Sequence, residues 1–519
     1  MAKVNQIGFC DGGRTEFNHF IILYLVERAR RRGEELFVIA LDFKKAFDSV
    51  NRIKLIETLI EYRVHPNIVD LVARLYSDDR TVLTLGEMKR EVRVNSGIKQ
   101  GCPLSTTLFK LVTFMIIRKL EEEGAEYEVE GRNASSLFFA DDSMLFSKTK
   151  QDAEKNLRIM TEVGREYGLE INKEKSKILI YNGNENYTEV GGIEVVKDFK
   201  YLGLILDDED DIYTKQKEGM LSKAKRHENM TYQVVENSCN RVLIGKTYWK
   251  SMVLPTTLYG AGLMNVNEAQ IGKLQSTENG VYRKILGARE NTVVEVLRGE
   301  IGASATETRL VEARLMMAKS IHGSKNEWLK EILNKVRRNA GNPWNRGLNK
   351  SLEKVGISYE ELIEMSKLEI KRKVREWDSR KWREGLSRKS SVKIYRENKK
   401  EVKEDKVYDN RKPSQILFQA RANCMALNER NRHREGGETR CEICDEGEME
   451  NLGHFLLACE ALDSERDDEL VERNCGATAE EWIGNILWRE EDMEKVKEMM
   501  GKMWQKRRVL RKRLGLSAT

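Results

Sequence analysis

The stretch LFFADDSMLF, residues 137–146, sets two adjacent aspartates between two apolar tetrads. The apolar flanks predict two short strands with the acidic pair at their turn. An aspartate at a turn usually only caps the local backbone. Here two carboxylates at the end of a buried hairpin repel each other and lose hydration unless a cation neutralises them. Carboxylate oxygens suit Mg²⁺ or Mn²⁺, so the stretch predicts a metal site.

A third carboxylate stands in LDFKKAFDSV, residues 41–50. Asp42 ends a short apolar run that contains Val and Ile, which predicts a buried strand. If this strand pairs with the hairpin, Asp42, Asp141 and Asp142 can hold two cations about 3.5–4 Å apart, the arrangement used for in-line phosphoryl transfer. Two alternatives stay open, since Asp42 could be a helix N-cap and Asp48 is an equally close carboxylate.

The patterns around these aspartates alternate between helix and strand. Helical patterns cover residues 16–31, 49–63, 66–76, 103–123 and 152–168, strand patterns cover 35–43 and 176–183, and a hairpin pattern covers 81–97 around Gly86. This alternation predicts an α/β sheet with helices on one face. From about residue 212 to 340 the patterns are almost all helical. Residues 366–406, rich in Lys, Arg and Glu with Trp377 and Trp382 interleaved, are interpreted as a helical connector.

Composition and charge limit the class of protein. A chain of 519 residues is long enough for two to four domains. With 34% charged residues, 40% apolar residues and only 5 prolines, we expect a folded, helix-rich protein. No run approaches the roughly 18 apolar residues of a membrane span, and the N-terminus lacks the apolar core of a signal peptide. We therefore expect a soluble intracellular protein, in the nucleus, the cytoplasm or both, with no membrane partner.

The net charge of +6 is unevenly spread. Residues 501–519 carry seven basic residues and no acidic one, which indicates either a polyanionic partner or a solvated helical face. As part of a nucleic-acid contact, this tail would use phosphate contacts and stacking on Trp504. As an alternative, the tail would serve as a nuclear localisation signal.

One group of cysteines is clustered, in CEICDEGEMENLGHFLLAC, residues 441–459. Cys441, Cys444, His454 and Cys459 follow the spacing C-x2-C-x9-H-x4-C. Three thiolates and one imidazole form a closed tetrahedral shell, which fits structural Zn²⁺; unrelated buried cysteines are the alternative. The segment between the second and third ligands is acidic, which favours a clasp that stabilises the fold over a phosphate-binding module. The remaining thiols are interpreted as ordinary: Cys10, Cys102, Cys239, Cys424 and Cys475.

Five motifs come in the order and roughly at the spacing of the palm motifs of reverse transcriptases: ALDFKKAFDSV, SGIKQGCPLSTTLF, FFADDSMLF, GLEINKEKSKILI and FKYLGLILD. They most resemble those of non-LTR (LINE-type) retrotransposons. NQIGFCDGGRT (5–15) resembles the preceding finger motif, LYGAGL and RKILGA resemble the thumb, and the cysteine cluster resembles the family's C-terminal zinc knuckle. The resemblance implies an α/β right-hand polymerase palm with partial fingers, a mainly α-helical thumb and connector, and a small zinc-binding module.

The resemblance also predicts five segments. They are partial fingers and palm over residues 1–185, the end of the palm and a helical thumb over 186–315, a basic helical connector over 316–435, a CCHC zinc knuckle over 436–465, and a basic helical tail over 466–519.

For the metal site, the resemblance implies that Asp42 and Asp141 bind both catalytic Mg²⁺ ions. The backbone carbonyl of Phe43 would be a further ligand, and Asp142 would assist. Phe47 matches the aromatic steric gate that lies against the sugar, and a core phenylalanine is the alternative.

For substrate binding, Gln100 and Gly101 match the loop that contacts the incoming nucleotide and the template. The glycine is needed because the backbone must approach closely. Lys175 is similar to the lysine that meets the triphosphate, with Lys173 and Lys177 as alternatives. YLGL, residues 201–204, resembles the primer-grip hairpin.

The implied activity is RNA-directed DNA polymerisation, with an RNA template, a DNA primer or target DNA, and dNTPs as partners. The chain begins inside the family's finger region, so we expect a truncated element or a partial gene model. An endonuclease is not visible, so target cleavage would need a separate domain or protein. The alternative is a catalytically weak or inactive RNA-binding remnant. A group II intron maturase shares the palm but is less consistent with the zinc pattern.

Overall fold

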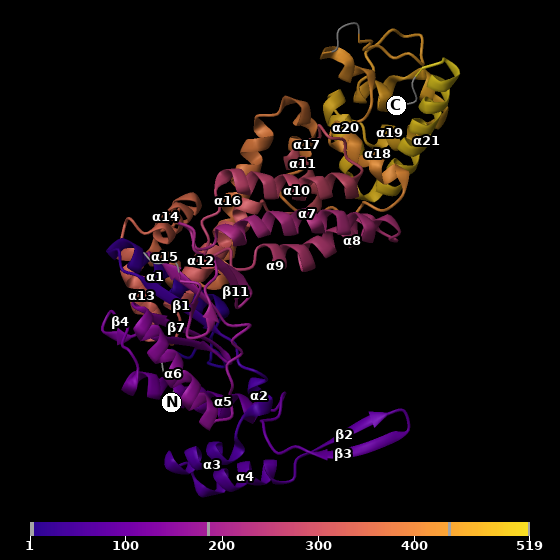
Figure 1. Ribbon diagram of the computed structural model, residues 1–519. Helices are drawn as coiled ribbons and strands as arrows, with labels where there is room; N and C mark the ends of the chain where they lie inside the picture. The colour runs from indigo at the N-terminus through magenta and orange to yellow at the C-terminus, as the bar shows by residue number, and fades with distance from the viewer. Residues whose placement is uncertain (1–4, 184–186, 434–436, 517–519) are drawn as a thin grey trace. The chain divides into compact units, whose positions relative to one another are not determined.

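The computed structural model describes residues 5–183, 187–433 and 437–516 (Figure 1). The chain forms two compact units, each assembled from separate stretches of sequence. The first unit contains Met1–Glu218, Gly260–Asn265 and Arg314–Lys350, and the second contains Gly219–Tyr259, Val266–Ala313 and Ser351–Thr519. The five functional segments predicted from the sequence stay predictions.

The first unit is built on a four-stranded sheet. Its strand order is β6 (Ser136–Phe139), β7 (Asp142–Ser147), β1 (Leu36–Leu41) and β8 (Lys177–Tyr181), and all neighbouring strands are antiparallel. β1 is a central strand and is almost continuously buried and apolar, which is expected for a strand covered on both faces.

Helices cover both faces of this sheet. On one face, Phe37 and Ile39 of β1 share a core with Phe109 and Met160, which lie on α5 (Pro103–Glu123) and α6 (Lys150–Glu166). On the other face, Arg30 of α1 (Thr15–Arg32) lies 5.0 Å from the centre of the Tyr181 ring. The prediction of helices on one face is therefore wrong. The run FNHFIILYLV in α1 has no continuous polar face, which is typical of a helix buried on more than one side.

Most other elements of the first unit agree with the sequence patterns, but the helix expected over 49–63 begins only at Arg52, and the short hairpins at 128–133 and 189–194 were not predicted. Further helices are α2 (Ala46–Ser49), α3 (Arg52–Glu61), α4 (Pro66–Ser77) and α13 (Glu327–Arg338), and four hairpins are β2 (Arg80–Leu85) with β3 (Met88–Arg93), β4 (Glu128–Val129) with β5 (Arg132–Asn133), β9 (Glu189–Val190) with β10 (Ile193–Glu194), and β11 (Asp198–Tyr201) with β12 (Leu204–Asp207). Pro66 and Pro103 each open a helix, as predicted, because proline at the first helical position loses no hydrogen bond.

A buried histidine fixes α1 to the β11–β12 hairpin. The His19 side chain is fully buried, and its Nε2 lies 3.0 Å from the carbonyl oxygen of Tyr201. The Tyr213 hydroxyl lies 3.2 Å from Nδ1. These contacts suit a neutral imidazole that donates from Nε2 and accepts at Nδ1. Burial lowers the pKa of His19 from 6.5 to about 4.

The second unit is helical in its described residues. Its elements are α8 (Arg241–Tyr248), η1 (Trp249–Val253), α9 (Leu254–Thr257), α10 (Glu268–Leu286), α11 (Val294–Ile301), α15 (Tyr359–Glu364), α16 (Lys367–Ser387), η2 (Ser390–Val392), α17 (Lys393–Asn398), α18 (Lys412–Arg421), η3 (Asn428–His433), η4 (His454–Ala458), η5 (Glu460–Glu465), α19 (Asp468–Arg473), α20 (Ala479–Trp488), η6 (Glu490–Asp492) and α21 (Met493–Arg513). Three helices contribute to both units: α7 (Thr214–Glu236), α12 (Thr306–His322) and α14 (Pro343–Val355). No described helix is long and apolar enough to cross a membrane.

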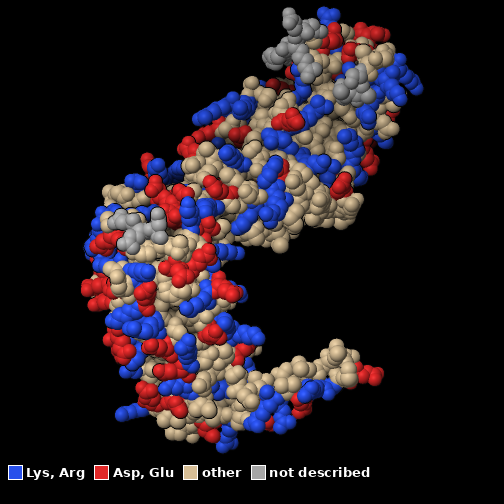
Figure 2. All heavy atoms as spheres, in the orientation of Figure 1, with Lys and Arg blue, Asp and Glu red and all other residues tan. Residues whose placement is uncertain are grey.

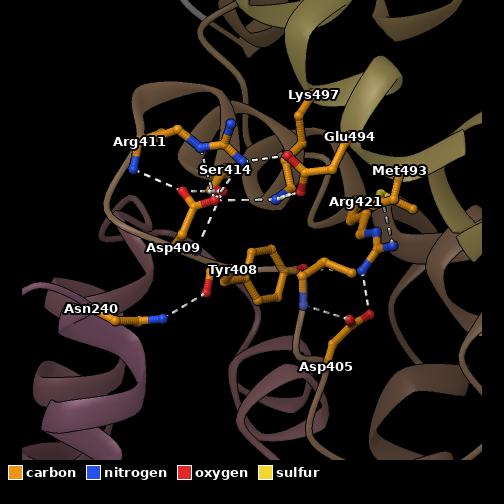
Figure 3. A network of polar contacts seen from close by, with 11 residues as sticks. Asn240, Asp405, Tyr408, Asp409, Arg411, Ser414, Arg421, Met493, Glu494 and Lys497 are labelled. Carbon is orange, nitrogen blue, oxygen red and sulfur yellow. Dashed lines mark hydrogen bonds and ion pairs between the residues drawn. The ribbon is translucent and has the colours of Figure 1, made fainter.

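Residues 366–406, interpreted from the sequence as a helical connector, are a packed part of this second unit. Trp382 of α16 is buried in the same apolar core as Tyr395 of α17 and Leu417 of α18. A polar network follows the chain into α18 (Figure 3), where the buried Arg421 side chain pairs with Asp405 at 2.5 Å. The interleaved tryptophans thus anchor a basic helix to a core.

The pH dependence of stability should report the burial of His19. Because its pKa is about 4 in the fold and 6.5 as the reference value, protonation opposes folding as the pH falls from about 6.5 to 4. We expect a loss of about 2–3 kcal/mol of unfolding free energy over that range and no such loss above pH 7. Urea denaturation at several pH values measures it. His19→Gln should flatten this dependence, and the exposed His65→Gln should not; equal profiles for all three chains would contradict the assignment.

Candidate functional site

Three aspartates converge at one end of the central strands. β1 pairs with β7 in the register Leu41↔Ser143, so Asp42 follows β1 opposite the start of β7 at Asp142. Asp141 lies in the turn that joins β6 to β7. Partial burial, then the charges of Asp141 and Asp42, raise the pKa of Asp142 from 3.8 to about 6. The carboxylates are thus close enough to repel one another, and their oxygens form a donor set that fits a hard divalent cation.

Asp48, the alternative carboxylate, is engaged elsewhere. It lies on α2, and its Oδ1 accepts a hydrogen bond from Nε2 of Gln100 at 3.1 Å. It is not among the charges that shift Asp142. The geometry therefore favours Asp42 as the third member of the carboxylate group. Asp42 does not cap a helix, since the residue before α2 is Lys45.

A buried glutamine holds the turn that carries Asp141. Ala140 has a φ of 62°, a left-handed conformation that is unfavourable for a residue other than glycine. Gln6 is 8% exposed, and its Oε1 accepts hydrogen bonds from the backbone N–H of Ala140 at 3.2 Å and of Gly8 at 2.8 Å. Its Nε2 donates to Oγ1 of Thr113 at 3.1 Å. Sequence reasoning missed Gln6, because nothing in its local pattern reveals a contact 134 residues away.

A second set of hydrogen bonds fixes Asp42. Its backbone N–H donates to Oγ of Ser176 at 3.2 Å, and its carbonyl accepts from the N–H of Asn172 at 2.7 Å. The Ser176 hydroxyl donates to the Asn172 carbonyl at 2.8 Å. The adjacent Phe43, the predicted carbonyl ligand, forms a β-bridge with Ile171. The motif GLEINKEKSK thus buttresses the first aspartate, a role that its sequence did not indicate.

The residues predicted to contact the incoming nucleotide lie in two places. Phe47 is on α2, shortly after Asp42, and Gln100 and Gly101 are in the loop before α5. The Phe47 ring stacks on Phe109 with centroids 4.6 Å apart, and it meets Phe9 edge-on at 6.2 Å. Phe47 is only half-buried, so it is anchored in the core and still presents a surface. Gln100 is exposed and bonded to Asp48. Gly101 has a φ of 85°, which favours glycine.

The three candidate lysines differ in their partners. Lys173 donates from Nζ to the carbonyl of Gly191 at 3.0 Å, and Lys177 pairs with Glu194 at 2.6 Å. Lys175 is exposed, and within the described part of the chain its ammonium has no side-chain or carbonyl partner. Of the three lysines, these contacts therefore favour Lys175 as the one that binds an anion.

The predicted zinc ligands come together in the second unit. One donor atom from each of Cys441, Cys444, His454 and Cys459 lies within 4.8 Å of all the others. The Cys441 and Cys459 sulfurs are 3.9 Å apart, near the roughly 3.8 Å that a tetrahedron with Zn–S bonds of about 2.3 Å requires. Nε2 of His454 lies 3.4 Å from the Cys444 sulfur. The four donors therefore fit one zinc ion without an open position.

Electrostatics support the same cluster. Contact with Cys459 lowers the pKa of the Cys441 thiol, while contact with Cys441 and burial raise the pKa of the Cys459 thiol. Glu446 lies 3.7 Å from Nδ1 of His454, on the nitrogen away from Cys444. At that distance the carboxylate does not hydrogen-bond to the ring, and the buried Nδ1 has no hydrogen-bond partner among the described residues.

The basic C-terminal helix is partly neutralised inside the second unit. Arg507 is buried and pairs with Glu450 at 2.6 Å, and Arg511 pairs with Glu442, so α21 is tied to the segment that carries the cysteines. Trp504 is 7% exposed and meets Phe455 edge-on at 5.9 Å. The prediction that Trp504 stacks on bases is therefore wrong, because its ring is used in the core.

Comparison with known proteins agrees with this site. Residues 1–206 match the family described as reverse transcriptase (RNA-dependent DNA polymerase). This part of the chain is therefore a reverse transcriptase domain, and the three aspartates belong to it.

Several relatives are R2 non-LTR retrotransposon Pol proteins, which confirms the resemblance inferred from the motifs. The chain is 26% identical over 254 residues to the Pol polyprotein of the type-1 retrotransposable element R2 of Bradysia coprophila, covering 44% of this chain and 29% of that protein. It is 28% identical over 215 residues to that of the type-2 element R2DM of Drosophila melanogaster, covering 38% and 20%. The chain thus spans less than a third of the length of these relatives. Apo telomerase from Candida tropicalis aligns with a TM-score of 0.32 and 13% identity, over 64% of this chain and 57% of that one.

The Gln6 side chain should stabilise the Asp141 turn measurably. Gln6→Leu removes the acceptor of two buried N–H groups, and we expect a loss of about 1–3 kcal/mol of unfolding free energy. Chemical denaturation measures the change. Gln151→Leu, on the exposed side of α6, is the matched control and should alter stability by no more than about 0.5 kcal/mol. Equal stabilities for the two variants would show that Gln6 does not hold the turn.

The cysteine cluster should bind about one equivalent of zinc. Metal analysis of protein purified without chelator measures the content. The double variant Cys441→Ser/Cys444→Ser should lose it, because serine is a poor zinc ligand. Cys239→Ser/Cys475→Ser, which changes two exposed thiols outside the cluster, should retain it. Zinc-free wild-type protein, or equal zinc in both double variants, would rule out this site.

Proposed function

We propose that this chain is an RNA-directed DNA polymerase of a non-LTR retrotransposon, which transfers nucleotides from dNTPs to a primer 3′-hydroxyl on an RNA template. The observation that carries the proposal is the convergence of Asp42, Asp141 and Asp142 on rigid antiparallel strands within a reverse transcriptase domain. The proposed partners are an RNA template, a DNA primer or target DNA, and dNTPs. Cleavage of target DNA is assigned to a separate endonuclease domain or protein.

The carboxylates of Asp42 and Asp141 would hold two Mg²⁺ ions, with the Phe43 carbonyl as a further ligand and Asp142 assisting. Bound there, the ions would supply the charge that activates the primer hydroxyl and stabilises the departing pyrophosphate. The protein's own contribution is to fix these oxygens before substrate arrives. Gln6 holds the Asp141 turn, and Ser176 with Asn172 holds the Asp42 backbone. The aspartates that hold the ions then need little reorganisation during the reaction.

The remaining residues would position the substrates. Phe47, braced by Phe109, would lie against the sugar and exclude a 2′-hydroxyl. Gln100 and the tight backbone at Gly101 would contact the nucleotide and the template. Lys175, whose ammonium has no partner among the described residues, would donate to the triphosphate. The β11–β12 turn, held to α1 through His19, would grip the primer by apolar and backbone contacts.

Primer extension on an RNA template with Mg²⁺ tests this proposal. Asp141→Asn should lower the extension rate by more than about 100-fold, since loss of a metal ligand costs more than loss of an outer partner. Asp142→Asn should lower it less. Asp70→Asn, which makes the same chemical change on the exposed face of α4, should leave the rate unchanged.

Two outcomes would overturn the polymerase assignment. Extension unaffected by Asp141→Asn would exclude the proposed metal site. Wild-type protein that binds the template–primer and extends nothing would favour the RNA-binding remnant instead.

A further inference from the structure

One face of α16 lines a groove of about 770 Å³ within the second unit, together with Val355 and Gly356. The other face of the helix is anchored in the core, where Val374 and Trp382 are buried. The groove is therefore carried by a rigid helix. It lies wholly within the second unit and contains no residue assigned to the polymerase site.

The groove is strongly basic. Its charged lining consists of Lys371, Arg372, Lys373, Arg375, Arg380 and Arg383 against Glu369 and Glu376. Glu369 already accepts from the backbone N–H of Ser366 at 2.7 Å, in a capping box at the start of the helix. Glu376 lies 3.8 Å from Arg372 and 3.9 Å from Lys373, distances at which exposed pairs gain little.

Three arginines in this groove have no acidic neighbour in pairing range. Within residues 5–183, 187–433 and 437–516, no carboxylate lies close enough to form an ion pair with Arg375, Arg380 or Arg383. On the face that Figure 2 shows, acidic and basic side chains are intermixed over most of the surface. These three arginines thus bring guanidiniums without an ion-pair partner among the described residues to a concave surface, which favours a polyanionic ligand.

The spacing and the chemistry of the groove narrow the class of ligand. Arg375 to Arg383 spans about 12 Å along the helix axis, over which one strand of a duplex presents about three or four phosphates. None of the described residues that line the groove is aromatic, because Trp377 and Trp382 point into the core. Proteins that bind single strands usually stack bases on exposed aromatic rings, so this groove lacks their main contact.

We propose that the α16 groove binds the sugar–phosphate backbone of a nucleic-acid duplex through Arg375, Arg380 and Arg383. The contacts are charge-assisted hydrogen bonds from guanidinium to phosphate, which position a duplex without reading its sequence. The shared ligand chemistry is the duplex backbone, whether it is B-form DNA, A-form RNA or an RNA–DNA hybrid. The proposal is independent of whether the palm polymerises, since the groove and the aspartates share no residue.

Duplex binding by the full chain tests the proposal. Fluorescence anisotropy with short blunt-ended DNA, RNA and RNA–DNA hybrid duplexes, measured over a salt series, gives both the affinity and its salt dependence. The triple variant Arg375→Gln/Arg380→Gln/Arg383→Gln should weaken binding by at least about tenfold. A plot of the logarithm of the association constant against the logarithm of the salt concentration should also become shallower by about 2–3. Each phosphate that the protein neutralises contributes about 0.9 to the steepness of that slope. The duplex whose affinity falls most identifies the natural form.

Two control variants separate the groove from overall charge. Lys502→Gln/Arg508→Gln/Lys512→Gln removes the same charge from the exposed side of α21. It should weaken binding less than about twofold and leave the salt slope nearly unchanged, because the groove still neutralises the same phosphates. Arg375→Lys/Arg380→Lys/Arg383→Lys keeps the charge and should retain most of the binding. Thermal melting of all variants checks that the fold is intact.

The outcomes are distinct from those of the polymerase test. Asp141→Asn should bind the blunt duplexes as the wild type does, even if it extends nothing. Equal reductions of affinity in the groove and α21 variants would overturn the proposal, because net charge alone would then explain binding. Undiminished duplex binding by the groove variant, or tighter binding of single strands than of any duplex, would overturn it as well.

Discussion

The antiparallel pairing of β1 with β7 is the constraint on which the site depends. Its register, Leu41↔Ser143, decides that Asp42 leaves the sheet beside Asp142. Side chains alternate between faces along a strand, so a slip of one residue would turn Asp42 to the opposite face of the sheet, away from Asp142. The apolar residues of β1 and β7, covered by helices on both faces, therefore specify the register. The hydrophobic core positions the carboxylates before any cation binds.

The strand register does not determine the conformation of the turns, which hydrogen bonds from residues far away in the sequence hold in place. A turn with a left-handed alanine is costly, and it is held because Gln6 bonds to it from a segment at the start of the chain. His19 holds the Tyr201 carbonyl from α1 in a comparable way. In each case one buried polar side chain satisfies a turn that local sequence does not favour. The strand and turn geometry of the site thus rests on segments far apart in sequence.

Sequence patterns predicted the elements well where local chemistry decides them. Pro66 and Pro103 mark helix starts and the apolar run before Asp42 marks a strand, since these effects act over a few residues. The aspartates were identifiable because carboxylates between apolar flanks lose hydration on folding, which is unfavourable unless a cation binds them. Gln6 was not identifiable, because its role depends on a tertiary contact that leaves no local periodicity. The second helical layer over the sheet was missed for a similar reason, since α1 packs on a face that its own sequence does not specify.

The two most basic segments of the chain show why charge composition alone does not assign a binding surface. In α21, the buried Arg507 and Glu450 satisfy each other, and removing one partner would leave an uncompensated charge in the core. That part of the basic run is therefore committed to holding the helix against the cysteine segment. In α16, Arg380 and Arg383 line a groove without acidic partners among the described residues, and their charge remains to be neutralised from outside. The number of arginines is similar in the two helices, but only a guanidinium without an internal partner is free to bind phosphate. The distribution of carboxylates around each helix, which no composition reveals, thus decides which of its arginines are held inside the protein and which can bind phosphate.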